Sequence, residues 1–409
     1  MLKQGTIRPL IRGATLFWAL GALAATYHIL SRYPVGQIWP VAAAAGLAAL
    51  VFVTPDRWRL ASAIAAGIAV RIAAYSTIAQ PPLDDPGSYF NLASNILSGR
   101  GMVVANETYG TLWAAFPPAY PLMLAAAGLQ WLALNLLFDL VAAWAIYRLS
   151  SSPTAAAVYF LFPGTILASV VPSKESLAVA LVLLLPLVRN PWLFGALAGA
   201  LVLAQPAWAP IPLIFFIVAR RTGWWKALAA TVLVLSPWWV RNYLLFGEFV
   251  PLTSSAGLSL AVAVEGRHLS TLAIPGDEIR RASVVASAAL NHIIADPLHY
   301  LGNVVRMLIR SFLVDDDPYE YLTWSHAAWL GAAALAGQLA WAALIAAAAL
   351  TRRSIPPWLL ALILAAAVSC AAGIWLEFSS RHRAFVIPLL ILVATGRSGR
   401  EPGSVPAAH

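Results

Sequence analysis

The chain has 409 residues, of which 61% are hydrophobic and only 11% are charged. An average soluble domain carries roughly 25% charged residues, so this composition excludes an ordinary water-soluble protein and indicates a chain surrounded mostly by lipid. Backbone groups in hydrocarbon must be paired within their own segment, and the Ala- and Leu-rich runs lack the alternation of barrel strands. The predicted fold class is therefore all-α. The net charge of +9 comes mostly from residues flanking apolar runs, and we expect no nucleic-acid partner.

The apolar runs predict a polytopic transmembrane helical bundle. A hydrocarbon layer of about 30 Å needs roughly 20 apolar residues per crossing, and shorter runs are tolerated where helices pack together. We expect the whole chain, residues 1–409, to form a single integral membrane domain without a soluble C-terminal domain. About twelve candidate helices follow in chain order: 13–30, 37–54, 60–78, 130–149, 154–171, 176–188, 191–205, 207–219, 225–240, 326–350, 357–376 and 384–396.

The distribution of charge predicts the orientation of these helices. Lys3, Arg8 and Arg12 precede the first run, which has the form of a signal sequence and equally of an anchor helix, and we expect the anchor. With its N-terminus inside, every inside turn carries arginine, as the positive-inside rule requires. The long segments 79–129 and 241–325 and the turn 377–383 then lie outside and hold nearly all the acidic residues. Polar chemistry is therefore expected on the extracytoplasmic side.

One segment of the second long excursion predicts an amphipathic helix at the membrane surface. Asp296-Pro297 has the form of an N-cap followed by proline at the first helical position. Apolar residues then recur at steps of three and four, whereas Arg306 and Arg310 lie off this stripe. Such a helix lies along the membrane surface. The two arginines either meet ordinary lipid headgroups or bind the phosphate of a lipid substrate. The apolar stripe consists of Leu298, Leu301, Val305, Leu308 and Phe312.

Acidic residues occur at two predicted outside turns. Asp84 and Asp85 follow a membrane helix, and a carboxylate placed there can take a proton from an acceptor hydroxyl within hydrogen-bond reach. Asp85 precedes Pro86 and is equally suited to cap the helix that follows. Glu175 follows Lys174 at a second turn, and capping is again the alternative.

Cations also occur on the outside, against the positive-inside rule. Arg241 ends one membrane helix, and Arg381-His382-Arg383 follows Glu377 near the end of the chain. Arginine forms bidentate hydrogen bonds with phosphate, so we expect these cations to bind the phosphate of a lipid.

Taken in order, these motifs resemble the GT-C superfamily of membrane glycosyltransferases. The likeness spans residues 60–396 approximately and is closest to the bacterial relatives of protein O-mannosyltransferases and of the aminoarabinose transferase that modifies lipid A. Each motif alone is weak, and five in order on one face are fairly specific. They are Asp84-Asp85 with Tyr89, Leu92-Ala93 and Gly99-Arg100-Gly101; Pro117-Pro118-Ala119-Tyr120-Pro121; Glu175; Arg241-Asn242-Tyr243 with Phe246-Gly247; and Arg381 with Arg383 and Pro388.

The resemblance implies roles for individual residues. Counting back four positions from Tyr89 gives Asp85 as the catalytic base, with Asp84 beside it. Glu175, Tyr89 and Tyr120 are expected to orient the acceptor or the sugar. The expected phosphate-binding residues are Lys174, Arg241, Arg306, Arg310, Arg381, His382 and Arg383.

Three positions depart from the family pattern. Gln205 stands before Pro206 where many members have arginine, Phe116 replaces a lysine before the Pro-Pro segment, and His382 replaces a tyrosine. The first two changes remove cations that some members use near the lipid phosphate.

The resemblance implies transfer of a sugar from a polyprenyl-phosphate donor, of the undecaprenyl-phosphate type, to a glycan, lipid or protein acceptor. The reaction is expected at the outer face of a bacterial inner membrane. The sequence does not require a metal ion, and it leaves the binding of a divalent ion open.

Two alternative functions share the same features. One is a carrier or flippase for a lipid-linked sugar, and the other is a polymerase or ligase of lipid-linked oligosaccharides. A carrier places its site near the bilayer midplane, where the predicted helices hold only Arg71 and Asp139, which we expect to form a structural ion pair.

Overall fold

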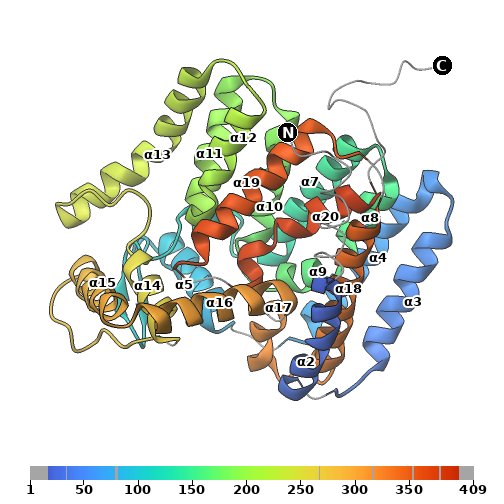
Figure 1. Cartoon of the computed structure of the whole chain (residues 1–409), viewed down its shortest axis with the longest axis horizontal. Coiled ribbons are helices and arrows are strands. Elements are labelled where there is room, and N and C mark those ends of the chain that lie inside the picture. Colours follow the sequence, from blue (N-terminus) through green and yellow to red (C-terminus); the bar gives the residue numbers. More distant parts are fainter. Residues whose placement is uncertain are drawn as a thin grey trace.

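The computed structural model describes residues 17–33, 35–78, 82–266, 268–315, 317–351, 354–376 and 379–395 (Figure 1). This part of the chain is predominantly helical, as predicted. Within it, three helices are long and apolar enough to cross a membrane: α4 (Asp56–Ser76), α7 (Trp131–Ser150) and α18 (Leu330–Leu350). Four residues used in the sequence argument, Lys3, Arg8, Arg12 and Glu377, lie outside the described residues.

Sixteen further helices are described, of which α13 is longer than these three and the others are shorter. In chain order they are α2 (Thr26–Arg32), α3 (Trp39–Val53), α5 (Asp84–Leu97), α6 (Ala119–Ala126), α8 (Pro153–Phe160), α9 (Pro163–Ser169), α10 (Glu175–Leu184), α11 (Pro191–Ala204), α12 (Pro210–Val218), α13 (Trp224–Phe246), α14 (Ala256–Glu265), α15 (Glu278–Ala295), α16 (Pro297–Leu313), α17 (Asp317–Glu320), α19 (Pro357–Gly373) and α20 (Val386–Thr395). Single 3₁₀ turns occur at η1 (Leu185–Leu187), η2 (Pro206–Trp208), η3 (Thr323–Ser325) and η4 (Ser380–Arg383). The strands β1 (Val104–Asn106) and β2 (Gly110–Leu112) form an antiparallel hairpin.

The predicted helix 154–171 is broken in two. Proline lacks a backbone N–H and disfavours helical geometry at the residue before it. Phe162, which precedes Pro163, is extended, with φ −64° and ψ 128°, so α8 ends before it and α9 begins after it. The predicted helix 176–188 likewise ends as the 3₁₀ turn η1, which contains Pro186. Its α-helical part, α10, has ten residues, or about 15 Å of length. It is thus about half as long as the hydrocarbon layer is thick.

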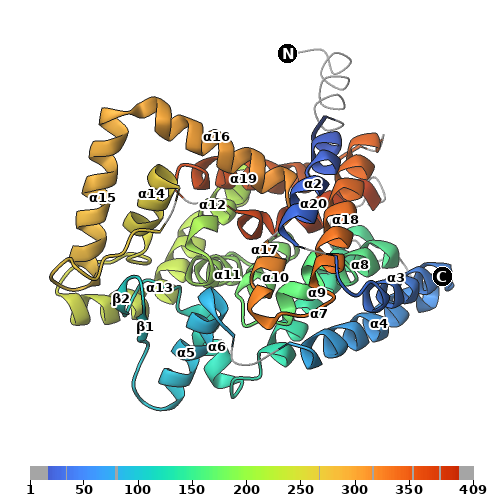
Figure 2. The same cartoon turned by 90° about the horizontal axis from the view of Figure 1, so that it is seen from below.

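The β1–β2 hairpin, α14 and α15 lie near one another on the side of the molecule opposite α3 and α4 (Figure 2), and α15 contacts β2. Glu278, at the start of α15, accepts hydrogen bonds from the backbone amides of Trp113 and Ala114, the latter at 2.7 Å. The hydroxyl of Ser254 donates to the same carboxylate at 2.9 Å. These contacts hold α15 against the end of the β1–β2 hairpin and bring the two predicted outer segments together.

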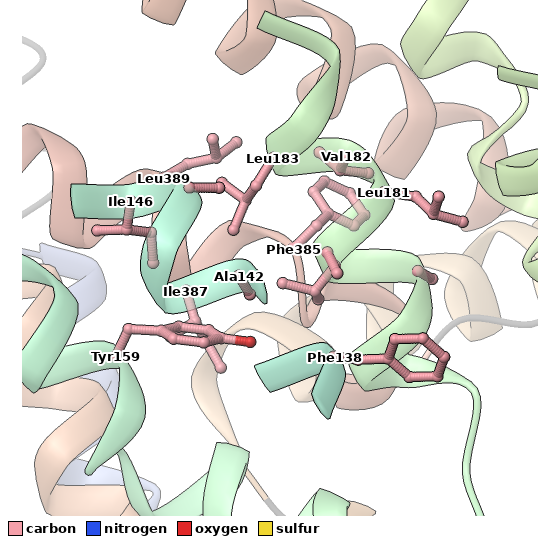
Figure 3. Close-up of a cluster of buried hydrophobic side chains, with 14 of the residues drawn as sticks. Phe138, Ala142, Ile146, Tyr159, Leu181, Val182, Leu183, Phe385, Ile387 and Leu389 are labelled. Atoms are coloured by element: carbon pink, nitrogen blue, oxygen red, sulfur yellow. The ribbon is translucent and has the colours of Figure 1, made fainter. Parts of the chain in front are cut away.

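The main hydrophobic core lies between α7, α8, α10 and α20 (Figure 3). Large apolar side chains from all four elements are buried there. Among them are Phe138 and Ile146 of α7, Tyr159 of α8, Leu181 and Leu183 of α10, and Phe385, Ile387 and Leu389 in and just before α20. This packing fixes the start of α10 and the η4 turn, which both contribute to the site described below.

Close helix packing also occurs between α11 and α13. Gly195 and Gly199 are four residues apart and therefore lie on one face of α11, where a β-carbon at Gly195 would collide with the backbone of Ala227. Small residues at this spacing let two helix backbones approach closely, which is typical of helices packed in a membrane.

The predicted ion pair between Arg71 and Asp139 is confirmed. The Arg71 Nη2 and Asp139 Oδ2 atoms are 2.9 Å apart, and the two side chains are 1% and 0% exposed. Arg71 also donates to the Ser169 hydroxyl at 2.8 Å and to the Phe160 carbonyl at 2.9 Å. The pair therefore ties α4, α7, α8 and α9 together.

Candidate active site

Asp85 lies in the first turn of α5 and faces a cation from the far end of the chain. Its Oδ2 atom accepts a hydrogen bond from Arg381 Nη1 at 2.5 Å and another from the Tyr321 hydroxyl at 3.3 Å. The N-cap residue of α5 is Leu83, so the carboxylate of Asp85 is not the N-cap of this helix. The neighbouring Asp84 is exposed and has a positive φ of 54°. Of the two predicted acids, only Asp85 has a charged partner in the described structure.

Electrostatics favour the ionised form of Asp85. Burial by itself raises the pKa of this carboxyl, but the charges of Arg381 and Lys174 outweigh burial and leave the pKa below its ordinary value of 3.8. The side chain is 37% exposed, so solvent and ligands can reach it. Asp85 is consequently a carboxylate at neutral pH, but one already engaged by a cation.

The two predicted tyrosines form a wall next to Asp85. The ring of Tyr89 meets those of Phe116 and Tyr120 edge to face, at centroid distances of 5.4 and 5.6 Å. The Lys174 ammonium lies 5.6 Å from the centre of the Tyr89 ring, a cation–π arrangement. Tyr120 is fully buried, and its hydroxyl donates to Asn135 at 3.0 Å. Tyr120 therefore supports the site from behind and has no free surface to stack on a sugar.

A small cavity of about 50 Å³ is lined in part by Arg381 and Tyr321. Glu175 at the start of α10 lines it together with Ser173 and Ser176, and the cavity extends inward to Asp139. Its volume is enough for a few water molecules and too small for a sugar ring. A sugar would have to lie outside it.

Two of the predicted phosphate ligands are structural in this arrangement. Arg383 has no exposed surface, pairs with Asp315 at 3.2 Å and lies 3.8 Å from the centre of the Trp341 ring. His382 accepts a hydrogen bond from the backbone amide of Ser379 at 3.1 Å. Its pKa is held well below the usual value by burial and by the nearby Arg381 and Lys174 charges, so the ring is neutral. Neither side chain offers a positive charge to a ligand.

The other predicted cations have partners other than Asp85 or are exposed. Arg306 is exposed on α16, and Arg310 on the same helix is 3.8 Å from Glu320. Arg241 contacts the carbonyl of Met102, beyond the far end of α5. The structure thus groups Asp85, Lys174, Glu175 and Arg381, whereas Arg241 contacts the segment beyond α5 and Arg306 and Arg310 lie on α16, which packs against η4.

The predicted N-cap of α16 is present, but the face of the helix that packs against the protein is not simply the apolar stripe. Asp296 Oδ1 accepts the backbone N–H of His299 at 3.0 Å, as an N-cap does. Asn303, which lies off the apolar stripe, is buried and donates to the Val264 carbonyl at 2.7 Å. Leu298, of the stripe, is 78% exposed. The polar hydrogen bond fixes the helix against α14, which leaves part of the apolar stripe on the outside.

Sequence reasoning missed Tyr321 and Asp315. Neither lies in a recognisable motif, and each acts through a partner more than 60 residues away in the chain, Asp85 for one and Arg383 for the other. Among the residues that the structure describes, no three His, Cys, Asp or Glu side chains gather as a metal site would require.

No family model matches the chain, and neither the curated proteins nor the solved structures contain a match to it. The assignment of function therefore rests on the geometry of the site and on the order of the sequence motifs.

Proposed function

We propose that this protein is a membrane glycosyltransferase that moves a sugar from a polyprenyl-phosphate carrier to an acceptor at the outer face of a bacterial inner membrane. The proposal includes a bundle of about twelve membrane helices in a GT-C-like arrangement. One observation carries it: the reachable Asp85 carboxylate contacts the Arg381 guanidinium at 2.5 Å, with Lys174 close by, on a chain rich in apolar helices. A base for the acceptor hydroxyl and cations for the lipid phosphate are the two requirements of this reaction.

The ion pair suggests how the donor prepares the site. A carboxylate bound to arginine is a weak base, because the cation stabilises its ionised form. A donor phosphate competes for the same guanidinium, with which it forms bidentate hydrogen bonds. Movement of Arg381 from Asp85 to the phosphate then frees the carboxylate when the donor is bound.

Transfer follows in one balanced step. Asp85 takes the proton of the acceptor hydroxyl, and the acceptor oxygen attacks the anomeric carbon of the donor sugar. The bond between that carbon and the phosphate oxygen breaks, and its electron pair stays on the carrier phosphate. Arg381 and Lys174 stabilise the phosphate charge. Glu175, in the first turn of α10, orients the sugar or the acceptor.

A carrier for a lipid-linked sugar is the second candidate, because the cavity beside Arg381 and Glu175 is also lined by Asp139 of the long apolar helix α7. The two candidates differ in whether a sealed membrane is needed. Sugar transfer can be measured in detergent micelles, whereas transport of a lipid-linked sugar can be measured only across a closed bilayer.

The test begins with the lipid that copurifies with the protein, identified by mass spectrometry. That donor is then incubated with the purified protein and an envelope extract in detergent. We expect release of the free polyprenyl phosphate together with a glycosylated acceptor. An intact donor in detergent, combined with its movement across sealed vesicles, would contradict the transferase and favour the carrier.

A further inference from the structure

A second surface depression lies along α13, outside the site at Asp85. It is an open groove of about 750 Å³ between α13 and the segment that follows α5. Its α13 side carries Val240 and Leu244, which are 57% and 79% exposed, and α13 lies at the edge of the molecule (Figure 1). The remaining lining residues are Gly101, Met102, Trp113, Ser236, Pro237, Arg241 and Leu245. The groove is therefore apolar, with one cation.

That cation, Arg241, forms no salt bridge within 4 Å among the described residues. The Glu278 carboxylate acts on it electrostatically from a greater distance and is itself engaged by the Trp113 and Ala114 amides and the Ser254 hydroxyl. One guanidinium nitrogen donates to the Asn242 side chain at 2.8 Å and another to the Met102 carbonyl at 3.1 Å. The guanidinium lies 4.8 Å from the centre of the Trp238 ring. Arginine has five N–H donors, so these two bonds orient the group and leave donors for a ligand. An anionic ligand in the groove could therefore pair directly with these donors.

The groove is separate from the proposed transfer site. Met102 is held near the far end of α5, where Asn95 donates to the adjacent Val103 carbonyl at 2.6 Å. Asn95 lies about three helical turns after Asp85, or roughly 15 Å along the helix axis. A phosphate bound to Arg381 beside Asp85 therefore does not reach Arg241.

We infer that this groove binds one anionic glycerophospholipid of the surrounding bilayer. The lipid phosphate pairs with Arg241, and an acyl chain lies along Val240 and Leu244. The apolar lining excludes a small water-soluble anion as the principal ligand, whereas a lipid supplies both the charge and the hydrocarbon. This inference stands independently of the transfer reaction, since it concerns only a lipid held by α13.

Native mass spectrometry tests the inference by counting lipids retained on the purified protein. The protein is delipidated and then titrated in mixed micelles with phosphatidylglycerol or, as the phosphate-free control, with diacylglycerol of the same chains. Arg241→Gln removes the charge, and Arg100→Gln, at an exposed arginine outside the groove lining, is its matched control. Val240→Trp fills the groove, and Val232→Trp, at another exposed valine of α13, is the control for it. Thermal unfolding verifies that each variant is folded.

We expect one tightly retained phosphatidylglycerol on the wild type and on both controls. Arg241→Gln should weaken its binding about 10- to 100-fold, the range of a charge-assisted hydrogen-bonded contact. Val240→Trp should reduce retention as well, because the indole occupies the place of the acyl chain. Unchanged retention in both variants would overturn the inference, as would equal retention of diacylglycerol. Stoichiometric displacement of phosphatidylglycerol by a polyprenyl phosphate would also overturn it, because the groove would then belong to the donor.

Discussion

At the level of single residues, the two adjacent acids of the first outer segment differ in their partners. Asp84 is exposed at a left-handed backbone position, whereas Asp85 contacts Arg381 and Tyr321. The sequence cannot distinguish them, because both partners of Asp85 are more than 200 residues away in the chain. Only the folded structure shows which of the two carboxylates is stabilised in its ionised form by a neighbouring cation.

The lowered pKa of Asp85 predicts the pH dependence of the free enzyme. Lys174 is one of the two main charges that hold this pKa below 3.8. Lys174→Gln removes that charge, so the pKa of Asp85 rises and the acid limb of kcat/KM moves to higher pH. The maximal kcat/KM will also fall, but the pH at the midpoint of the acid limb does not depend on that maximum. Lys226→Gln, at a lysine of α13, should leave the limb in place, and an identical profile for Lys174→Gln would contradict this role of the charge.

The buried pair of Arg71 and Asp139 predicts a large effect on stability. Removing one partner leaves an uncompensated buried charge, which costs about 3–5 kcal/mol. Arg71→Met and Asp139→Leu should therefore each destabilise the protein strongly in unfolding measured in detergent, and the double variant should recover part of the loss. Arg148→Gln, at the exposed end of α7, serves as the control. A double variant whose destabilisation equals the sum of the two single effects would rule out the coupling.

At the level of elements, the apolar runs predict where helices occur better than how long they are. Proline explains the difference at Pro163 and Pro186, where one predicted run becomes a pair of short segments. A break in a helix places a new helix N-terminus inside the apolar part of the protein, and a polar side chain can be accommodated there. Glu175, buried in the first turn of α10, is one example.

The contact between α11 and α13 predicts opposite effects of the same substitution at two glycines. Gly195→Ala places a β-carbon against the Ala227 backbone, so the helices must separate and the protein loses stability. Gly46 in α3 has no atom within 4 Å of such a carbon, and alanine there should stabilise the helix by up to about 1 kcal/mol. Thermal unfolding of both variants in one detergent measures the difference. Equal effects at the two positions would show that α11 and α13 do not approach this closely.

At the level of the whole molecule, the expected outer segments meet in one region, which predicts that they share a side of the membrane. Single cysteines at Ser98 and Ser270, both exposed, are introduced into a Cys370→Ala background. An impermeant thiol reagent should label both positions in intact cells with a permeabilised outer membrane. Protection of either cysteine would contradict the proposed orientation.

The sequence predicts local features well and distant partners poorly. Hydropathy gives the helical class, and the Asp296-Pro297 signal gives a cap that the structure confirms, because both depend on neighbouring residues. The Arg71–Asp139 pair is also predictable, since unpaired charges are costly in apolar helices. The burial of Arg383 and the contacts of Tyr321 are not, because they depend on segments that only tertiary packing brings together.

The central claim is that Asp85 acts as the general base of a sugar transfer. The most direct measurement compares transfer rates of Asp85→Asn and Asp84→Asn, each with unchanged thermal stability and donor-lipid binding. We expect Asp85→Asn to reduce the rate by roughly 10²–10⁴, the usual contribution of a positioned base, and Asp84→Asn to stay near wild type. A near wild-type rate for Asp85→Asn would contradict the claim, and Glu175→Gln would then be the next substitution to measure.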